Sequence, residues 1–208
     1  EPDAVNVGLV VGEHGHLVID TGSSPEQGRA IRDAALTHAG VPLAAVAITH
    51  AHHDHVGGLA AFDDVPSLGH RSVPGLTRPL ALAATVDLGG VHCEVVHFGA
   101  GHTGGDAVVV VPERRVVFAG DLLEESGPPQ FDADTATRSW PTSLDGVLGM
   151  LRPGTLIVPG HGAVMDRQRA FLQRAEIAAV WAEAEHQLGR GVLADAALDA
   201  GNWPWERD

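Results

Sequence analysis

The stretch THAHHDHVGG, residues 49–58, places four histidines and one aspartate in the six positions from His50 to His55. Imidazole and carboxylate groups are common ligands of zinc and other transition metals. In an extended segment His50, His52 and Asp54 would share a face. A helix would instead pair His50 with Asp54 and His52 with His55. Under either conformation the stretch supplies too few ligands for a complete site, so a metal site would need ligands from elsewhere in the chain.

Four apolar runs each lead directly to a histidine or an aspartate. The runs VAIT, VVHFGAGH, VVFAGD and LIVPGH lead to His50, His102, Asp121 and His161. Such runs predict strands, and the glycines beside them permit sharp turns and close backbone approach. Loops at strand ends often carry reactive side chains because the sheet holds them in place. We therefore expect the three later residues to complete the site begun by residues 49–58.

The rest of the pattern predicts strands with interleaved helices. Strands are expected at 5–11, 16–20, 43–49, 91–98 and 155–160, with a hairpin over 106–121. Helices are expected after a Ser23 or Ser24 cap with Pro25 first and Gly40 at the end, then near 56–62, 143–151, 164–188 and 192–200. Residues 66–90 contain three prolines and no clear pattern. The order predicts an α/β (α+β) chain of packed layers.

Two expectations concern the longer helix and the domain organisation. The helix at 164–188 is expected to be amphipathic, with its apolar face formed by Phe171, Ala175, Ala178, Trp181 and Ala182. No linker divides the chain, so residues 1–208 are expected to form a single domain, with 163–208 as a C-terminal helical segment and tail.

Composition narrows the classes of partner. The 208 residues are 44% hydrophobic, and 13 cations, all arginine, face 27 acidic residues, for a net charge of -14. This charge disfavours nucleic acid, and no apolar run approaches the roughly 20 residues that span a bilayer. Cys93, the only cysteine, lies in an alternating run that predicts a buried strand position. A reducing, cytoplasmic compartment is expected, with secretion left open.

These motifs resemble those of the metallo-β-lactamase superfamily. His50-Ala51-His52-His53-Asp54-His55 resembles its H-x-H-x-D-H signature. The other family elements occur in the family's order: DTG at 20–22, GHTGGD at 101–106, AGD at 119–121 and PGHG at 159–162. The resemblance covers roughly residues 5–165, and it is more specific to the superfamily than to any substrate.

The resemblance implies a four-layer αβ/βα sandwich with two metal ions at one edge. The first metal would be bound by His50, His52 and His102, and the second by Asp54, His55 and His161, with Asp121 bridging both. His53 occupies the variable position of the motif and is not expected to bind metal. Asp54 and Asp121 are the expected catalytic residues. The ligand types suit two zinc ions, with iron or manganese left open.

The implied activity is that of a dinuclear metal-dependent hydrolase. Zinc lowers the pKa of a bound water to about 7, and two metals roughly 3.5–4 Å apart can hold a bridging hydroxide. The expected partner is a small molecule with an ester, thioester, lactone or amide bond. Histidine ligands usually need acceptors on their second ring nitrogen, for which Asp20, Thr49, Thr103 and Asp106 are candidates.

Several activities found in the superfamily fit this sequence poorly. Asp121 disfavours a true β-lactamase, since the di-zinc β-lactamases lack a bridging aspartate at this point. The chain has no tyrosine and no lysine, which disfavours acyl-homoserine lactones and glutathione thioesters. Acidic charge opposes a ribonuclease of the RNase Z type. Two alternatives stay open: an oxidoreductase like the persulfide dioxygenases, with one iron, and a metal-binding regulatory protein without catalysis.

Several residues near the motifs are expected to be structural. Glu124 and Glu125 follow the AGD motif; they are expected in a solvated loop rather than over the site. Packing or a partner contact, rather than a place in a substrate wall, is expected for Trp140, Trp203 and Trp205.

Overall fold

The computed structural model describes residues 4–205 and forms two five-stranded sheets. The first sheet has the order β1 (Gly8–Val11), β2 (His16–Ile19), β3 (Leu43–Ala47), β4 (Ser67–His70), β5 (Arg78–Leu80). The second has the order β10 (Leu156–Pro159), β9 (Val116–Gly120), β8 (Val108–Val111), β7 (His92–Val96), β6 (Ala83–Asp87). The outer limits of the expected range 1–208 lie outside the described residues.

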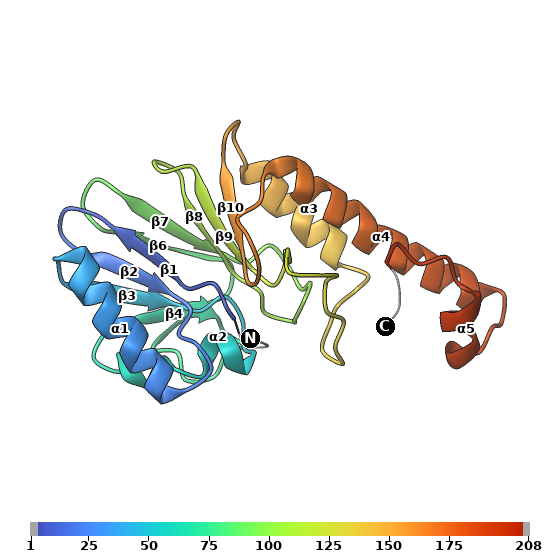
Figure 1. Cartoon of the computed structure of the whole chain (residues 1–208), viewed down its shortest axis with the longest axis horizontal. Coiled ribbons are helices and arrows are strands. Elements are labelled where there is room, and N and C mark those ends of the chain that lie inside the picture. The colour runs from blue at the N-terminus through green and yellow to red at the C-terminus, as the bar shows by residue number, and fades with distance from the viewer. Residues whose placement is uncertain (1–3, 206–208) are drawn as a thin grey trace.

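Helices cover the outer faces of the two sheets (Figure 1). The first sheet packs against α1 (Pro25–Ala39) and the 3-10 helix η1 (Leu59–Phe62), and α2 (His53–Val56) lies at its end. The second packs against α3 (Trp140–Met150) and α4 (Arg167–Gly189), and α5 (Ala194–Ala200) follows α4. The four-layer sandwich is thus confirmed.

Three buried apolar clusters hold the layers together. One lies between the sheets, where Leu17 and Leu68 of the first sheet meet Cys93 and Val109 of the second. Cys93 is fully buried there, as its strand pattern predicts. A second cluster lies between the first sheet and α1, and a third between the second sheet and α3 and α4. β8 lies between two of these clusters, with Val108 and Val110 in one and Val109 and Val111 in the other, so all four of its residues are apolar.

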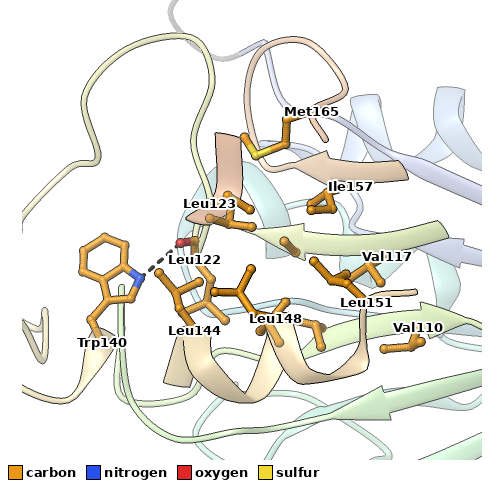
Figure 2. Close-up of a cluster of buried hydrophobic side chains, with 14 of the residues drawn as sticks. Val110, Val117, Leu122, Leu123, Trp140, Leu144, Leu148, Leu151, Ile157 and Met165 are labelled. Carbon is orange, nitrogen blue, oxygen red and sulfur yellow. Dashed lines mark hydrogen bonds between the residues drawn. The ribbon is translucent and has the colours of Figure 1, made fainter. Parts of the chain in front are cut away.

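The third cluster anchors the segment that carries Asp121. Figure 2 shows Leu144 and Leu148 of α3 packed toward Val117 and Ile157 of the second sheet. Trp140 begins α3 and is fully buried, and its Nε1–H donates a 3.1 Å hydrogen bond to the carbonyl of Leu122. Since Leu122 follows Asp121 directly, packing of this tryptophan fixes the backbone beside the aspartate.

The helix signals near residue 24 behave as expected. The Ser24 side chain accepts a hydrogen bond from the Gln27 N–H, Pro25 is the first helical residue, and Gly40 closes the helix at φ 64°.

The segment 66–90 forms strands β4, β5 and β6, which the sequence did not indicate. These strands have three to five residues, and β5 contains Pro79. Both β5 and β6 lie at sheet edges, where a strand tolerates proline and needs little apolar patterning.

The predicted apolar face of the long helix is wrong. Phe171 is 52% exposed, whereas the buried residues of α4 are Ala170, Gln173, Ile177 and Gln187. The two glutamines among them hide the helical period of this face. Among the described residues, no helix is both long and apolar enough to cross a membrane.

Candidate metal centre

The ends of four strands meet at one edge of the sandwich. His50 follows β3, His102 lies in the loop after β7, Asp121 follows β9 directly, and His161 follows β10. In the stretch 49–58, His50 lies in an irregular segment after β3, Ala51 and His52 form a bend, and His52, with an extended backbone, is the N-cap of α2. Neither a continuous strand nor a continuous helix is present: His50 and His52 come from the segment before the helix, and Asp54 and His55 from the helix.

The first group of side chains consists of His50, His52, His102 and Asp121, with one potential ligand atom from each within 4.8 Å of the others. His52 Nδ1 and His102 Nε2 are 2.9 Å apart. Asp121 Oδ2 lies 3.8 Å from His50 Nε2 and 3.6 Å from His102 Nε2.

The second group consists of Asp54, His55 and His161, again within 4.8 Å. Asp54 Oδ2 is 3.2 Å from His161 Nε2 and 3.6 Å from His55 Nε2. Asp121 reaches this group as well, because its Oδ1 lies 3.1 Å from His55 Nε2 and its Oδ2 lies 3.5 Å from His161 Nε2. The Asp121 carboxylate thus stands between the two groups.

Three buried polar atoms that lack hydrogen-bond partners indicate that these residues fit a metal ion. His50 Nε2, His55 Nε2 and Asp121 Oδ1 are buried and make no hydrogen bond. Buried polar atoms are normally satisfied, so orphan atoms facing one centre need an explanation. A metal ion at each group would provide it. Burial also holds the pKa of His50 well below its usual range, so this imidazole is neutral, as a ligand must be.

Hydrogen bonds between the histidines and carboxylates of the second group shift their pKa values. Hydrogen bonding to Asp121 and then to Asp54 raises the pKa of His161 to about 10. Although burial opposes the shift, the hydrogen bond from His161 helps to lower the pKa of Asp54 to about 2. A cation bound by the second group would therefore replace the His161 proton.

Asp20 orients His55 through Nδ1, the ring nitrogen that does not face Asp121. Asp20 Oδ2 accepts a 2.8 Å hydrogen bond from His55 Nδ1, which directs Nε2 toward Asp121. Asp20 also accepts bonds from the N–H and hydroxyl of Thr49, and the Thr49 hydroxyl lies 3.1 Å from His50 Nδ1. Asp20 has φ 62°, an uncommon conformation for a residue other than glycine. This aspartate therefore links the backbone before His50 to a ring of the second group.

Thr103 and Asp106 bond to each other rather than to the candidate ligands. The Asp106 carboxylate accepts hydrogen bonds from the Thr103 hydroxyl and from the N–H groups of Thr103 and Gly101. These bonds brace the loop that carries His102.

The N-terminal segment orients His161, a contact that the sequence did not indicate. His161 Nδ1 donates to the Ala4 carbonyl at 3.1 Å, so Nε2 faces Asp54 and Asp121. The Asn6 side chain donates to the carbonyls of Pro159 and Gly162 on either side of this histidine.

Gly160 allows β9 and β10 to approach closely at the site. Its N–H donates to the Gly120 carbonyl at 2.9 Å, and a Cβ at position 160 would overlap Asp121 Oδ1. The glycine of the PGHG motif is thus required for space beside the central carboxylate.

Glu124 is only 4% exposed, so its expected place in a solvated loop is wrong. Its Oε1 accepts hydrogen bonds from the Glu125 N–H and from the N–H and hydroxyl of Ser126. The buried Gln173 of α4 accepts from the Glu124 N–H and donates to the Glu124 carbonyl. Glu124 also forms a third potential metal-binding group with Asp121 and His161. The available signal of this burial was that Glu124 and Gln173 each follow a pair of large apolar residues in the sequence.

His53 belongs to none of these groups, and its side chain is 75% exposed. It lies at the rim of a cavity of about 360 Å³ over the second group. The cavity is also lined by His52, Asp54, Asp121, Ser126, Gln130, Asp132 and His161. This lining is polar throughout, so the cavity suits the polar part of a ligand.

We expect Asp20→Asn to weaken metal binding at the second group by about ten- to a hundredfold, the usual loss when a partner of a histidine ligand is removed. Asparagine tolerates the left-handed backbone at this position and keeps one oxygen for the Thr49 N–H, so the change removes the negative charge and the oxygen that accepts from His55. Competition with a chelator measures the affinity, and Asp33→Asn on the exposed side of α1 is the control. Equal affinity of both variants would mean that Asp20 does not support the site.

Comparisons with known proteins identify the family of this chain. The family model described as the metallo-beta-lactamase superfamily matches residues 1–84 and 71–175. A metallo-beta-lactamase type 2 from Bacillus sp. (strain 170) is 31% identical over 135 residues, which cover 59% of this chain and 52% of that protein. A hydroxyacylglutathione hydrolase from Ruegeria pomeroyi is 34% identical over 144 residues, covering 66% of this chain and 55% of that protein.

The chain therefore spans about half the length of the curated relatives it matches. A solved structure titled metallo-beta-lactamase from Pontibacter korlensis superposes with a TM-score of 0.74 at 23% identity, over 84% of this chain and 93% of that one. That likeness concerns the fold. The family model, which covers most of the chain, shows that this protein belongs to the metallo-β-lactamase superfamily.

Proposed function

We propose that this chain is a hydrolase that binds two metal ions and cleaves an ester, thioester, lactone or amide bond of a small molecule. The observation that carries the proposal is the position of Asp121 between two groups of histidine and carboxylate side chains. Relatives named as metallo-beta-lactamase and as hydroxyacylglutathione hydrolase support hydrolysis as the reaction class.

The first ion would be held by His50, His52 and His102, and the second by Asp54, His55 and His161, with Asp121 shared. Ions bound there would supply Lewis acidity at the bond to be cleaved and would lower the pKa of water. Zinc suits these ligands, and iron or manganese fit the same ligand types.

The protein's own side chains do the remaining work. Asp54 lines the cavity, and its Oδ2 lies against His161 and His55. We assign to its carboxylate the acceptance of a proton from the attacking water and its transfer toward the leaving group. Ser126 and Gln130 offer polar atoms to the substrate. The bonds from Asp20, Thr49 and Ala4 keep the rings of His55, His50 and His161 in place, so little reorganisation is needed during the reaction.

A substrate panel tests this proposal. The metal-loaded protein is assayed with a generic ester, a thioester, a lactone and nitrocefin, and its metal content is measured in the same samples. We expect turnover of at least one substrate, and loss of that turnover after chelation. A protein with two bound ions that hydrolyses none of the panel would contradict a hydrolase. One iron per chain with oxygen uptake on a persulfide would instead indicate an oxidoreductase.

A further inference from the structure

A second cavity, of about 470 Å³, lies between α4, α5 and the segment before α3. Val180 and Trp181 of α4, Leu198 of α5 and Trp203 and Trp205 near the C-terminus line it, facing Phe131. In Figure 1 the chain after α5 turns back along α4 toward the loop before α3, which places these segments together. No charged side chain lines this cavity among the described residues. Apolar cavities of this size are typical binding sites for small molecules.

One short segment separates the two cavities. Ser126, Gln130 and Asp132 line the polar cavity over the metal centre, whereas Pro129 and Phe131 line the apolar cavity. Because neighbouring residues of this segment line different cavities, the two cavities lie on either side of it.

A series of aromatic contacts also joins the apolar cavity to the metal centre. The Phe131 ring lies 6.2 Å from Trp205 and 5.4 Å from Trp140, measured between centroids. Trp140 in turn lies 5.7 Å from the ring of His102. Trp140 does not line the cavity, but it is fully buried and bonded to Leu122, so it gives the Phe131 ring of the cavity wall a fixed surface to pack against.

We propose that the apolar cavity binds an apolar acyl or aryl group of the substrate while its polar bond is cleaved at the metal centre. This inference rests on the proposed function and gives it a substrate class. The residues that line the polar cavity are all polar or charged, so an apolar group on the substrate would be buried mainly in the apolar cavity. Over residues 4–205 no cation lines the apolar cavity, so a ligand tail with carboxylates would find no counter-charge there.

The test is a chain-length series of p-nitrophenyl esters, from acetate to octanoate, with the metal-loaded protein. We expect KM to fall by up to about fourfold for each added methylene, with a much smaller change in kcat, because each methylene leaves water. Ala184→Glu places a charge among the lining residues and is expected to abolish most of this dependence. Ala182→Glu, at an exposed position of the same helix outside the lining, is the matched control.

A binding measurement separates failure of this inference from failure of the proposed function. Titration of 1-octanol into the protein should give saturable binding by calorimetry, lost in Ala184→Glu and kept in Ala182→Glu, whether or not any ester is hydrolysed. No binding of octanol, or the same chain-length dependence in both variants, would overturn the inference. It would also be overturned if the protein were dimeric and Ala184→Glu made it monomeric without changing that dependence, because the cavity would then be an interface between copies.

Discussion

Asp121→Asn is expected to lower kcat/KM by about a thousandfold or more on any substrate that the panel identifies. The Asp121 carboxylate lies within 3.8 Å of His50, His102 and His161 and 3.1 Å from His55, so one change removes a negative charge from both groups. Loss of metal-based stabilisation of the transition state is worth several kcal/mol, and each 1.36 kcal/mol is a factor of ten in rate. The measurement pairs steady-state kinetics with metal content per chain.

The metal content gives this prediction its control. Asp121→Asn and His50→Ala should each lose about one metal equivalent, whereas His53→Ala in the same stretch should lose none, since its side chain is 75% exposed and outside both groups. Retention of both ions and of full activity in Asp121→Asn would refute the bridging role.

Trp140→Ala is expected to lower the free energy of unfolding by about 3–5 kcal/mol, the usual cost of removing a large buried aromatic side chain. Trp140 is fully buried in the cluster of Figure 2, and the change also removes the donor to the Leu122 carbonyl. Urea unfolding of the metal-free protein measures the effect without the contribution of bound ions.

Leu193→Ala, at a side chain that is 80% exposed, is the control and should change stability by no more than about 0.5 kcal/mol. If Trp140→Ala cost as little as this control, the tryptophan would not anchor the segment after Asp121.

Much of the fold follows from local sequence patterns. Apolar runs predict the central strands, and Ser24, Pro25 and Gly40 predict the ends of α1, because these signals act within a few residues. The edge strands β5 and β6 carry no such pattern, since they are partly exposed and paired by distant partners. The buried stripe of α4 was also missed, because Gln173 lies in it for its bonds to the backbone of Glu124.

The candidate metal ligands could be predicted from the sequence, but the contacts that orient them could not. The residues expected to bind metal were readable from motifs, and the structure gathers them at one edge. The contacts that orient them join residues far apart in sequence: Asp20 to His55, and Ala4 to His161. No local pattern encodes such pairs. The burial of Glu124 likewise depends on α4, so its exposure could not be judged from the residues beside it.

Metal titration of the purified protein tests the two-metal account most directly. After removal of bound metal with a chelator, zinc is added back and the bound equivalents per chain are counted, with thermal unfolding followed in parallel. The account predicts close to two equivalents in the unaltered protein, one in His50→Ala, and a higher unfolding temperature with zinc present, because only the folded chain brings the two groups together. A single equivalent in the unaltered protein, or two equivalents that persist in His50→Ala, would contradict it.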